Sequence, residues 1–359
     1  MKKKILYIIA TQYDNMGDLL INKCLIDELA NYGNVYLDTK KVPADFKKIL
    51  LEHPNTFELS AISNFSFKGK GLLLVPFIKH NKYSHLFKSP GPFGGAKTVN
   101  DKIRYLIFYY LFFIMKRKGA ESYLIGNDLI VKSKFDAWVF RKFSFVLERM
   151  FVRSKKNVEI FKELQISNVG YVPDLCFLMN SEDKSSEKNK VGVSFRDLEN
   201  GVLHEKIVKS IKEMIVFYSN KSYQIEFFYQ VERDCLYNEN LYNLFKEMPN
   251  VSFRKGALTW EQRDFYKDVD AVLSNRLHVL LLAQSYNSIP MALIDDNAKT
   301  IKIKDIYESI GLEDFIYSDL SSNQIKFIYS SKVNLKSRII DVNQAQKVIF
   351  KNQLESIFK

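Results

Sequence analysis

An arginine and a histidine, Arg276 and His278, stand between two apolar runs of the sequence. The run before them, residues 270–274, has the length of a buried strand, and the run after them, residues 277–287, that of a helix. Burial of a charged group without a partner costs several kcal/mol, and a cation at a helix N-terminus is opposed by the helix dipole. Either a group inside the protein or a bound ligand must therefore pair these side chains.

Three further polar segments, residues 14–18, 195–197 and 230–234, also follow predicted strands. Ligands of doubly wound sheets bind at the carboxyl ends of the strands, so these segments are expected to share one cleft with the Arg-His segment. Gly17 permits close backbone approach, and the helix that begins there presents N–H groups to an anion. The planar guanidinium of Arg196 suits a carboxylate or a phosphate. The candidate site residues are Asn15, Gly17, Asp18, Arg196, Gln230, Asp234, Ser274, Arg276 and His278.

Several of these residues also have a purely structural interpretation. Asp18 is a reasonable helix cap, and Gln230 and Asp234 could cap the helix that follows them. Arg196 could be a surface charge at the end of a strand. His278 could be a core histidine whose hydrogen bonds are satisfied. The residue types alone leave these alternatives open.

The elements that must position these residues alternate between strands and helices. Residues 4–10 and 34–38 are predicted strands, and residues 15–33 form a predicted helix that stops at Gly33. This order indicates a parallel sheet with helical crossovers. Residues 89–95, SPGPFGG, are expected to be loop. The second half repeats the alternation, which predicts an α/β protein of two doubly wound, Rossmann-like domains that face a cleft.

The domain boundary is predicted in residues 181–190, SEDKSSEKNK, which lack any apolar residue. We therefore predict an N-terminal domain over residues 1–182, on the acceptor side, and a C-terminal domain over residues 183–335, on the donor side. The tail, residues 336–359, is predicted to be a helix that packs back on the N-terminal domain. A length of 359 residues fits two domains.

Composition and charge narrow the classes of partner. The net charge of +12 favours anionic partners, but the lysines are scattered and no RNA-reading signature is present, so nucleic acid is not expected. The three cysteines show no disulfide or zinc spacing, which favours a reducing, cytoplasmic location. The apolar start, residues 5–10, is shorter than a signal-peptide core and is interpreted as a strand.

A run of eleven apolar or tyrosyl residues at 105–115 is too short to span a bilayer, which takes about 20 residues. It predicts either a buried or half-buried helix or, over residues 103–118, a helix that touches a membrane. Three consecutive cations, Lys116, Arg117 and Lys118, follow the run and would suit the second interpretation.

An ordered set of motifs resembles the polysaccharide pyruvyl transferase family. The stretch SNRLHVLLLAQSYNSIPMALI is similar to the family's Ser-x-Arg-x-His…Ala…Pro signature. Four other stretches match in the same order: the Asn-x-Gly-Asp loop at 15–18, FVRSKKNVEIFKELQISNVGYVPDLCFLM at 151–179, Ser-x-Arg at 194–196, and Gln230 with Asp234. The resemblance spans roughly residues 5 to 312 and departs from the family at 125–128, where Ile-Gly-Asn-Asp stands in place of Gly-Pro.

The resemblance implies a fold like that of the B-type glycosyltransferases and an activity in surface or exopolysaccharide biosynthesis. The donor would be phosphoenolpyruvate, with no cofactor or metal, and the product a pyruvate ketal on a sugar. Arg196 and Arg276 would bind the donor's carboxylate and phosphate, and His278, its pKa raised beside an anionic ligand, would protonate the methylene carbon. Asp18 or Asp234 would be the base. Asn15, Gly17, Ser274 and Gln230 would contact substrate.

Two other functions are weighed beside this one. A nucleotide-sugar glycosyltransferase of the same fold would use the Arg-His pair to hold a diphosphate. A non-catalytic member of a polysaccharide assembly system would tolerate loss of the pair. The acceptor is expected to be a sugar or a lipid-linked oligosaccharide, and the net charge and the 105–115 run predict peripheral contact with an anionic membrane at its inner face.

Overall fold

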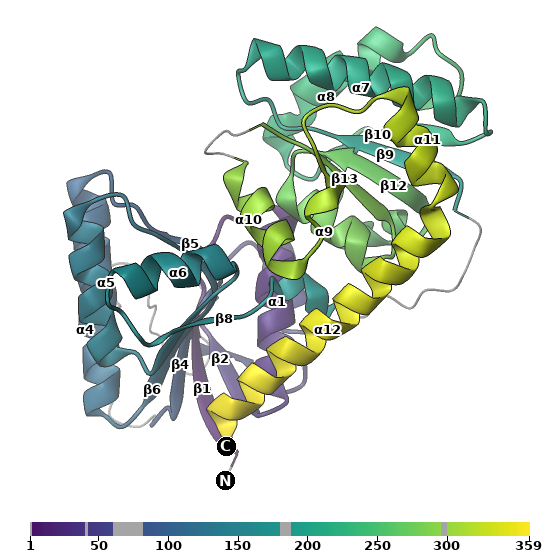
Figure 1. The fold of residues 1–359 in the computed structure, drawn as a ribbon. Coiled ribbons are helices and arrows are strands. Elements are labelled where there is room, and N and C mark those ends of the chain that lie inside the picture. Colours follow the sequence, from purple (N-terminus) through teal and green to yellow (C-terminus); the bar gives the residue numbers. More distant parts are fainter. Residues whose placement is uncertain (1, 40–41, 60–81, 180–187, 296–299) are drawn as a thin grey trace. The chain divides into compact units, whose positions relative to one another are not determined.

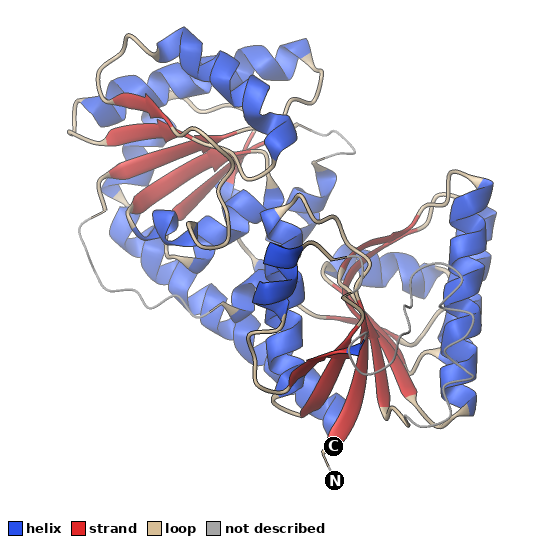
Figure 2. Ribbon diagram, turned by 180° about the vertical axis from the view of Figure 1, so that it is seen from behind, coloured by secondary structure: helices blue, strands red, loops and turns tan. Residues whose placement is uncertain are grey.

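The computed structural model describes residues 2–39, 42–59, 82–179, 188–295 and 300–359. It divides into two compact units: unit 1 comprises residues 1–13, 18–175 and 350–359, and unit 2 comprises residues 14–17 and 176–349. The predicted linker at 181–190 and the predicted boundary after residue 182 lie mostly or wholly outside the described residues. In each unit, helices cover both faces of one sheet (Figures 1 and 2).

Unit 1 is built on a sheet in which every described strand pair is parallel. Its strands are β1 (Lys3–Ile8), β2 (Gly33–Leu37), β3 (Thr56–Glu58), β4 (His85–Lys88), β5 (Gly91–Gly94), β6 (Glu121–Ile130), β7 (Arg149–Val152) and β8 (Val169–Tyr171). The order is β3-β2-β1-β4-β6-β7-β8, and β5 continues along the edge of β6 that β4 begins. The described helices of unit 1 include α1 (Met16–Ala30), α2 (Ala44–Leu50), α4 (Val99–Arg117), α5 (Lys134–Val146) and α6 (Lys155–Glu163).

Two expectations for unit 1 are wrong. Gly33 does not stop the first helix, which ends at Ala30; it opens β2, where a Cβ would lie 2.4 Å from the carbonyl oxygen of Lys3. Part of the SPGPFGG loop is a strand, because residues 91–94 pair with residues 127–130 of β6. Gly91 and Gly94 adopt φ angles of 106° and 107°, a region that glycine enters without a steric cost. Glycine and proline, which are typical of turns, therefore form the short strand β5, which pairs with β6 beyond the end of β4.

Helix α4 contains the apolar run and is half-buried. Thr98 and Asp101 form a capping box that fixes its start. One face of α4 packs into the aromatic core of unit 1, where Phe93 lies 5.6 Å from Phe108 and 5.7 Å from Phe143, between ring centroids. Within the described residues, no helix is long and apolar enough to cross a membrane.

Unit 2 is built on a second parallel sheet, with strands β9 (Lys190–Ser194), β10 (Gln224–Phe227), β11 (Val251–Phe253), β12 (Val269–Ser274), β13 (Ile289–Leu293) and β14 (Ile316–Tyr317). The order is β11-β10-β9-β12-β13-β14. Counted along the chain, this is the 3-2-1-4-5-6 order of the Rossmann fold. The described helices of unit 2 include α7 (Gly201–Ser219), α8 (Cys235–Phe245), α9 (Leu277–Ser285), α10 (Ile301–Ile310) and α11 (Ser322–Ser330).

The last helix, α12, runs from Lys332 to Phe358, four residues earlier at its start than the tail predicted from residue 336. Its residues up to 349 belong to unit 2, and its last residues belong to unit 1. In unit 1 the ring of Phe358 stacks on Tyr32 at 4.4 Å between centroids, and its carbonyl oxygen accepts a hydrogen bond of 2.7 Å from Lys3 Nζ.

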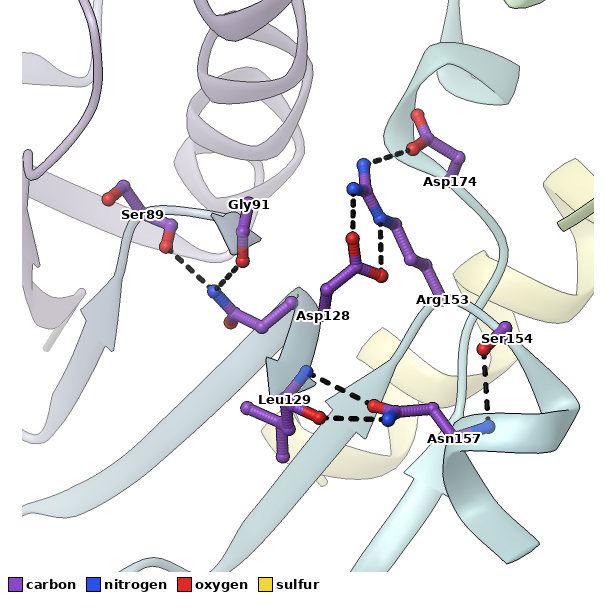
Figure 3. Close-up of polar contacts among 9 residues, drawn as sticks. Ser89, Gly91, Asp128, Leu129, Arg153, Ser154, Asn157 and Asp174 are labelled. Carbon is purple, nitrogen blue, oxygen red and sulfur yellow. Dashed lines mark hydrogen bonds and ion pairs between the residues drawn. The ribbon is translucent and has the colours of Figure 1, made fainter. Parts of the chain in front are cut away.

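A buried arginine ties together the carboxyl-end loops of unit 1 (Figure 3). Arg153 lies just after β7 and is 2% exposed; it donates to Asp128 of β6 and, at 3.0 Å, to Asp174. Burial lowers the pKa of Arg153, but the two carboxylates outweigh it, so the net shift is upward. Beside this group, Asn157 pairs reciprocally with the backbone of Leu129, at 3.1 Å and 2.9 Å.

Because two carboxylates surround Arg153, we expect Arg153→Met to destabilise the protein by about 3–5 kcal/mol. Urea unfolding followed by circular dichroism measures this loss. The matched control is Arg104→Met, which removes an exposed contact of 3.4 Å with Asp101 and a cation–π contact of 5.5 Å with the Tyr105 ring. This variant should cost less than about 1 kcal/mol. Equal losses in the two variants would contradict a stabilising role for the buried group.

Candidate active site

The candidate site lies where the sheet of unit 2 reverses its strand order. Strands β9 and β12 are neighbours, yet the chain continues from them to opposite sides of the sheet. Such a switch point leaves a crevice at the carboxyl ends of the strands, where ligands of open α/β sheets bind. Ser194 and Ser274, the last residues of the two strands, are register partners. Each is followed two residues later by an arginine, Arg196 or Arg276.

Hydrogen bonds join the two strand ends and fix both arginines at the backbone. The Ser274 hydroxyl donates to the Ser194 carbonyl oxygen at 2.5 Å and accepts from the Arg276 N–H at 3.0 Å. The Asn275 side chain accepts from the Arg196 N–H at 2.7 Å and donates to the Arg196 carbonyl oxygen at 2.9 Å. Ser274, which was predicted to contact substrate, is fully buried, and its described hydrogen bonds hold this junction.

A second asparagine repeats the arrangement one residue earlier. Asn238, from α8, accepts from the Phe195 N–H and donates to the Phe195 carbonyl oxygen, both at 2.8 Å. It also donates to the Asp234 carbonyl oxygen at 2.8 Å. Sequence reasoning missed Asn238 and Asn275. Asn275 stands inside the Ser-x-Arg segment and could have been suspected, but nothing in the sequence around Asn238 singles it out.

One buried carboxylate, that of Asp234, contacts Arg276, and the charges of Arg196 and Arg233 also act on it. Arg276 contacts Asp234, and their side chains are 15% and 4% exposed. Burial lowers the pKa of Arg276; Asp234 opposes this shift, and the charges of Arg196 and Arg233 add to it. For Arg196 and Arg233 the described residues supply no side-chain hydrogen bond or ion pair. Arg233 was not among the predicted residues, although it stands in the predicted segment 230–234.

Burial raises the pKa of the Asp234 carboxyl, and its contact with Arg276 offsets only part of that shift. The group thus carries three cations and one anion, a net charge of +2 when all are ionised. Such a cluster can bind an anion with two negatively charged groups, since two guanidiniums keep their donors for it.

His278 lies in the first turn of α9, which begins at Leu277; the N-cap residue Arg276 makes no side-chain cap hydrogen bond. A Cβ on Gly17 would lie 2.1 Å from the imidazole Nδ1, so only glycine leaves room for this ring. The Asn15 side chain accepts from the Gly17 N–H at 3.0 Å and caps the start of α1. Asn15 and Gly17 belong to unit 2, whereas Asp18, the next residue, belongs to unit 1.

Some of the predicted residues therefore lie together in unit 2, and others do not. Unit 2 holds Arg196, Asp234 and Arg276 in one charged cluster, and Gly17 lies against His278. Gln230 is buried and donates to the Tyr266 hydroxyl at 2.7 Å, so its described contact is structural. Asp18 lies in the first turn of α1 and is not the helix cap.

The two parallel sheets define an α/β protein with the architecture of the B-type glycosyltransferases. Solved structures support the fold. Anabaena HepE in complex with UDP-glucose is 12% identical, with a TM-score of 0.60 over 99% of each chain. The UDP-GlcNAc 2-epimerase of Neisseria meningitidis, bound to UDP-GlcNAc, is 11% identical, with a TM-score of 0.56 over 98% of this chain and 100% of that one.

The family model for polysaccharide pyruvyl transferase matches residues 15–287. The chain belongs to this family, and it is a transferase of polysaccharide biosynthesis. A search of curated protein sequences returned no match. The matched residues extend from Asn15 to just beyond α9, and so include every candidate side chain described above.

Because only glycine leaves room for the His278 ring, we expect Gly17→Ala to lower kcat/KM for pyruvyl transfer by about 10²-fold. The matched control is Gly201→Ala at the start of α7, where a Cβ meets no atom within 4 Å. Thermal unfolding of both variants separates a displaced imidazole from misfolding. Full activity in a folded Gly17→Ala protein would contradict the close packing.

Proposed function

We propose that the switch point of unit 2 binds phosphoenolpyruvate and that the protein transfers its three-carbon group to a sugar as a pyruvate ketal. The observation that carries the proposal is the junction at Ser194 and Ser274, which anchors Arg196 and Arg276 side by side at the backbone. Phosphoenolpyruvate carries a carboxylate and a phosphate, so its site needs fixed cations at two places.

The charges of the site match this donor. Arg196 and Arg233 keep their guanidiniums for a ligand, and Arg276 is oriented by Asp234. The net charge of +2 offsets most of the negative charge on the donor and on the phosphate that leaves. We assign charge stabilisation in the transition state to these arginines and invoke no metal or cofactor.

The reaction requires a proton donor and a proton acceptor. His278 gives a proton to the methylene carbon of the donor, which makes C2 electrophilic. One sugar hydroxyl adds to C2 and loses its proton to a base. The C2–O bond to the phosphate then breaks, a second sugar hydroxyl bonds to C2 in its place and gives its proton to the departing inorganic phosphate, and a ketal remains. Asp234 is buried against Arg276, so we assign it to orienting that arginine. Asp18, the residue after Gly17, is then the remaining candidate for the base.

For the acceptor we propose a sugar of a surface polysaccharide, or its lipid-linked precursor, reached by peripheral contact with the inner face of an anionic membrane. The net charge of +12 supports such contact. The exposed apolar side chains of α4 also support contact with a membrane.

Incubation of the protein with phosphoenolpyruvate and a panel of nucleotide sugars tests the donor. We expect release of inorganic phosphate alone, with loss of at least about 10²-fold in Arg196→Lys, because a lysine cannot bind bidentately. His278→Gln should remove most of the rate, because a glutamine side chain cannot deliver a proton to the methylene carbon. Release of a nucleoside diphosphate would favour glycosyl transfer. Intact polysaccharide modification in His278→Ala would favour a non-catalytic role.

The role of Asp234 is tested by its conservative variant. Asp234→Asn keeps an oxygen that can accept from Arg276, so we expect kcat to stay within about tenfold of wild type and KM for phosphoenolpyruvate to change little. Asp234→Leu removes the acceptor and should raise that KM. A loss of 10²–10⁴ in kcat for Asp234→Asn, as expected for a missing general base, would assign proton transfer to Asp234 instead.

A further inference from the structure

Helix α4 exposes an apolar stripe on the side that faces away from the core. Its exposed members recur at spacings of three and four residues, so they share one face of the helix. They are Val99, Ile103, Leu106, Tyr110 and Phe113, and their exposed fractions run from 70% down to 39%. Arg117 continues the stripe, with its guanidinium 5.5 Å from the centre of the Phe113 ring.

Helix α5 lies beside α4 (Figures 1 and 2) and carries a second stripe, in which basic and aromatic residues alternate. Its members are Lys134, Trp138, Arg141 and Phe145. Trp138 is 44% exposed and Phe145 is 71% exposed. Scattered apolar residues on a surface need no explanation, but two adjacent helices with aligned stripes form a continuous patch.

Contacts between the helices make the two stripes one surface. The Lys102 ammonium of α4 lies 5.4 Å from the centre of the Phe135 ring of α5, whose ring is 5.9 Å from that of Trp138. Farther along, Lys116 donates to the Phe145 carbonyl oxygen at 3.1 Å. We call the outward face of α4 and α5 the α4–α5 surface.

The charge of this surface is almost entirely positive. Helices α4 and α5 carry seven lysines and arginines, all exposed, and two aspartates. Asp136 is buried, and Asp101 is held in the capping box of α4. Glu148, just beyond α5, pairs with Lys116 at 3.4 Å. Exposed aromatic and aliphatic side chains among cations are typical of helices that lie in the interface of an anionic membrane.

We propose that the α4–α5 surface is the membrane-docking surface of this protein, and that it binds the anionic headgroups of a bilayer with both helices in the plane of the membrane. The inference rests on the proposed function, because a lipid-linked acceptor requires the enzyme at the membrane. The charge pattern favours lipid over a second copy of the chain, since a symmetric contact would bring the same cations face to face.

Co-sedimentation with vesicles tests the surface. The probes are phosphatidylglycerol–phosphatidylcholine vesicles and pure phosphatidylcholine vesicles. We expect the wild-type protein to bind the anionic vesicles, less tightly as salt rises. The triple variant Ile103→Ser, Leu106→Ser, Phe113→Ser and the double variant Lys134→Glu, Arg141→Glu should each bind at least about tenfold more weakly.

The matched control places the same changes on unit 2. Leu236→Ser, Leu244→Ser and Phe327→Ser alter side chains that are 59% to 69% exposed, and this variant should bind vesicles like wild type. Equal binding by the surface variants and the control would overturn the proposal. So would a concentration-dependent dimer, seen without lipid by analytical ultracentrifugation, that the triple variant abolishes.

A soluble sugar acceptor separates this inference from the proposed function. Phosphate release from phosphoenolpyruvate in detergent-free solution should be unchanged in the α4–α5 surface variants, because none of the altered residues belongs to the active site. Normal phosphate release without vesicle binding in the wild-type protein would overturn the docking surface alone. Vesicle binding without phosphate release would overturn the proposed donor chemistry alone.

Discussion

The junction between the ends of β9 and β12 is the constraint on which the active site depends. Parallel strands from distant parts of the chain meet there as register partners, and hydrogen bonds from Ser274 and Asn275 fix the backbone of the residues that follow. Arg196 and Arg276 therefore occupy fixed backbone positions just after the ends of two neighbouring strands. Arginines whose backbone is fixed in this way have less freedom to lose when an anion binds, and such preorganisation favours electrostatic stabilisation of a transition state.

The two units treat buried arginine differently, and the difference separates structure from function. In unit 1, Arg153 lies between Asp128 and Asp174, so its charge is satisfied inside the protein. In unit 2, Arg276 contacts a single carboxylate, that of Asp234, and the positive charges of Arg196 and Arg233 act on Arg276 as well. The first group closes on itself and stabilises the fold. The second leaves a net positive charge and is suited to an anionic ligand.

Much of this could be predicted from the order of apolar runs and turns. The α/β class, the parallel sheets and the segments that carry Arg196 and Arg276 follow from patterns that extend over many residues. The strand at Gly91–Gly94 could not be predicted, because glycine and proline are read as loop unless the partner strand is known. Asn238 was missed for a similar reason, since its hydrogen bonds reach Phe195, forty-three positions away.

By itself, the sequence determined the family, the fold class and the presence of cations beside strand ends, because local pattern and motif order carry that information. Only the tertiary structure decided which side chains act together. It paired Asp234 with Arg276, added Arg233, turned Gln230 towards Tyr266 and placed Gly17 against His278. The physical reason is that hydrogen bonds and charge act over a few ångströms in space. Residues of one site can meet those distances from any separation along the chain.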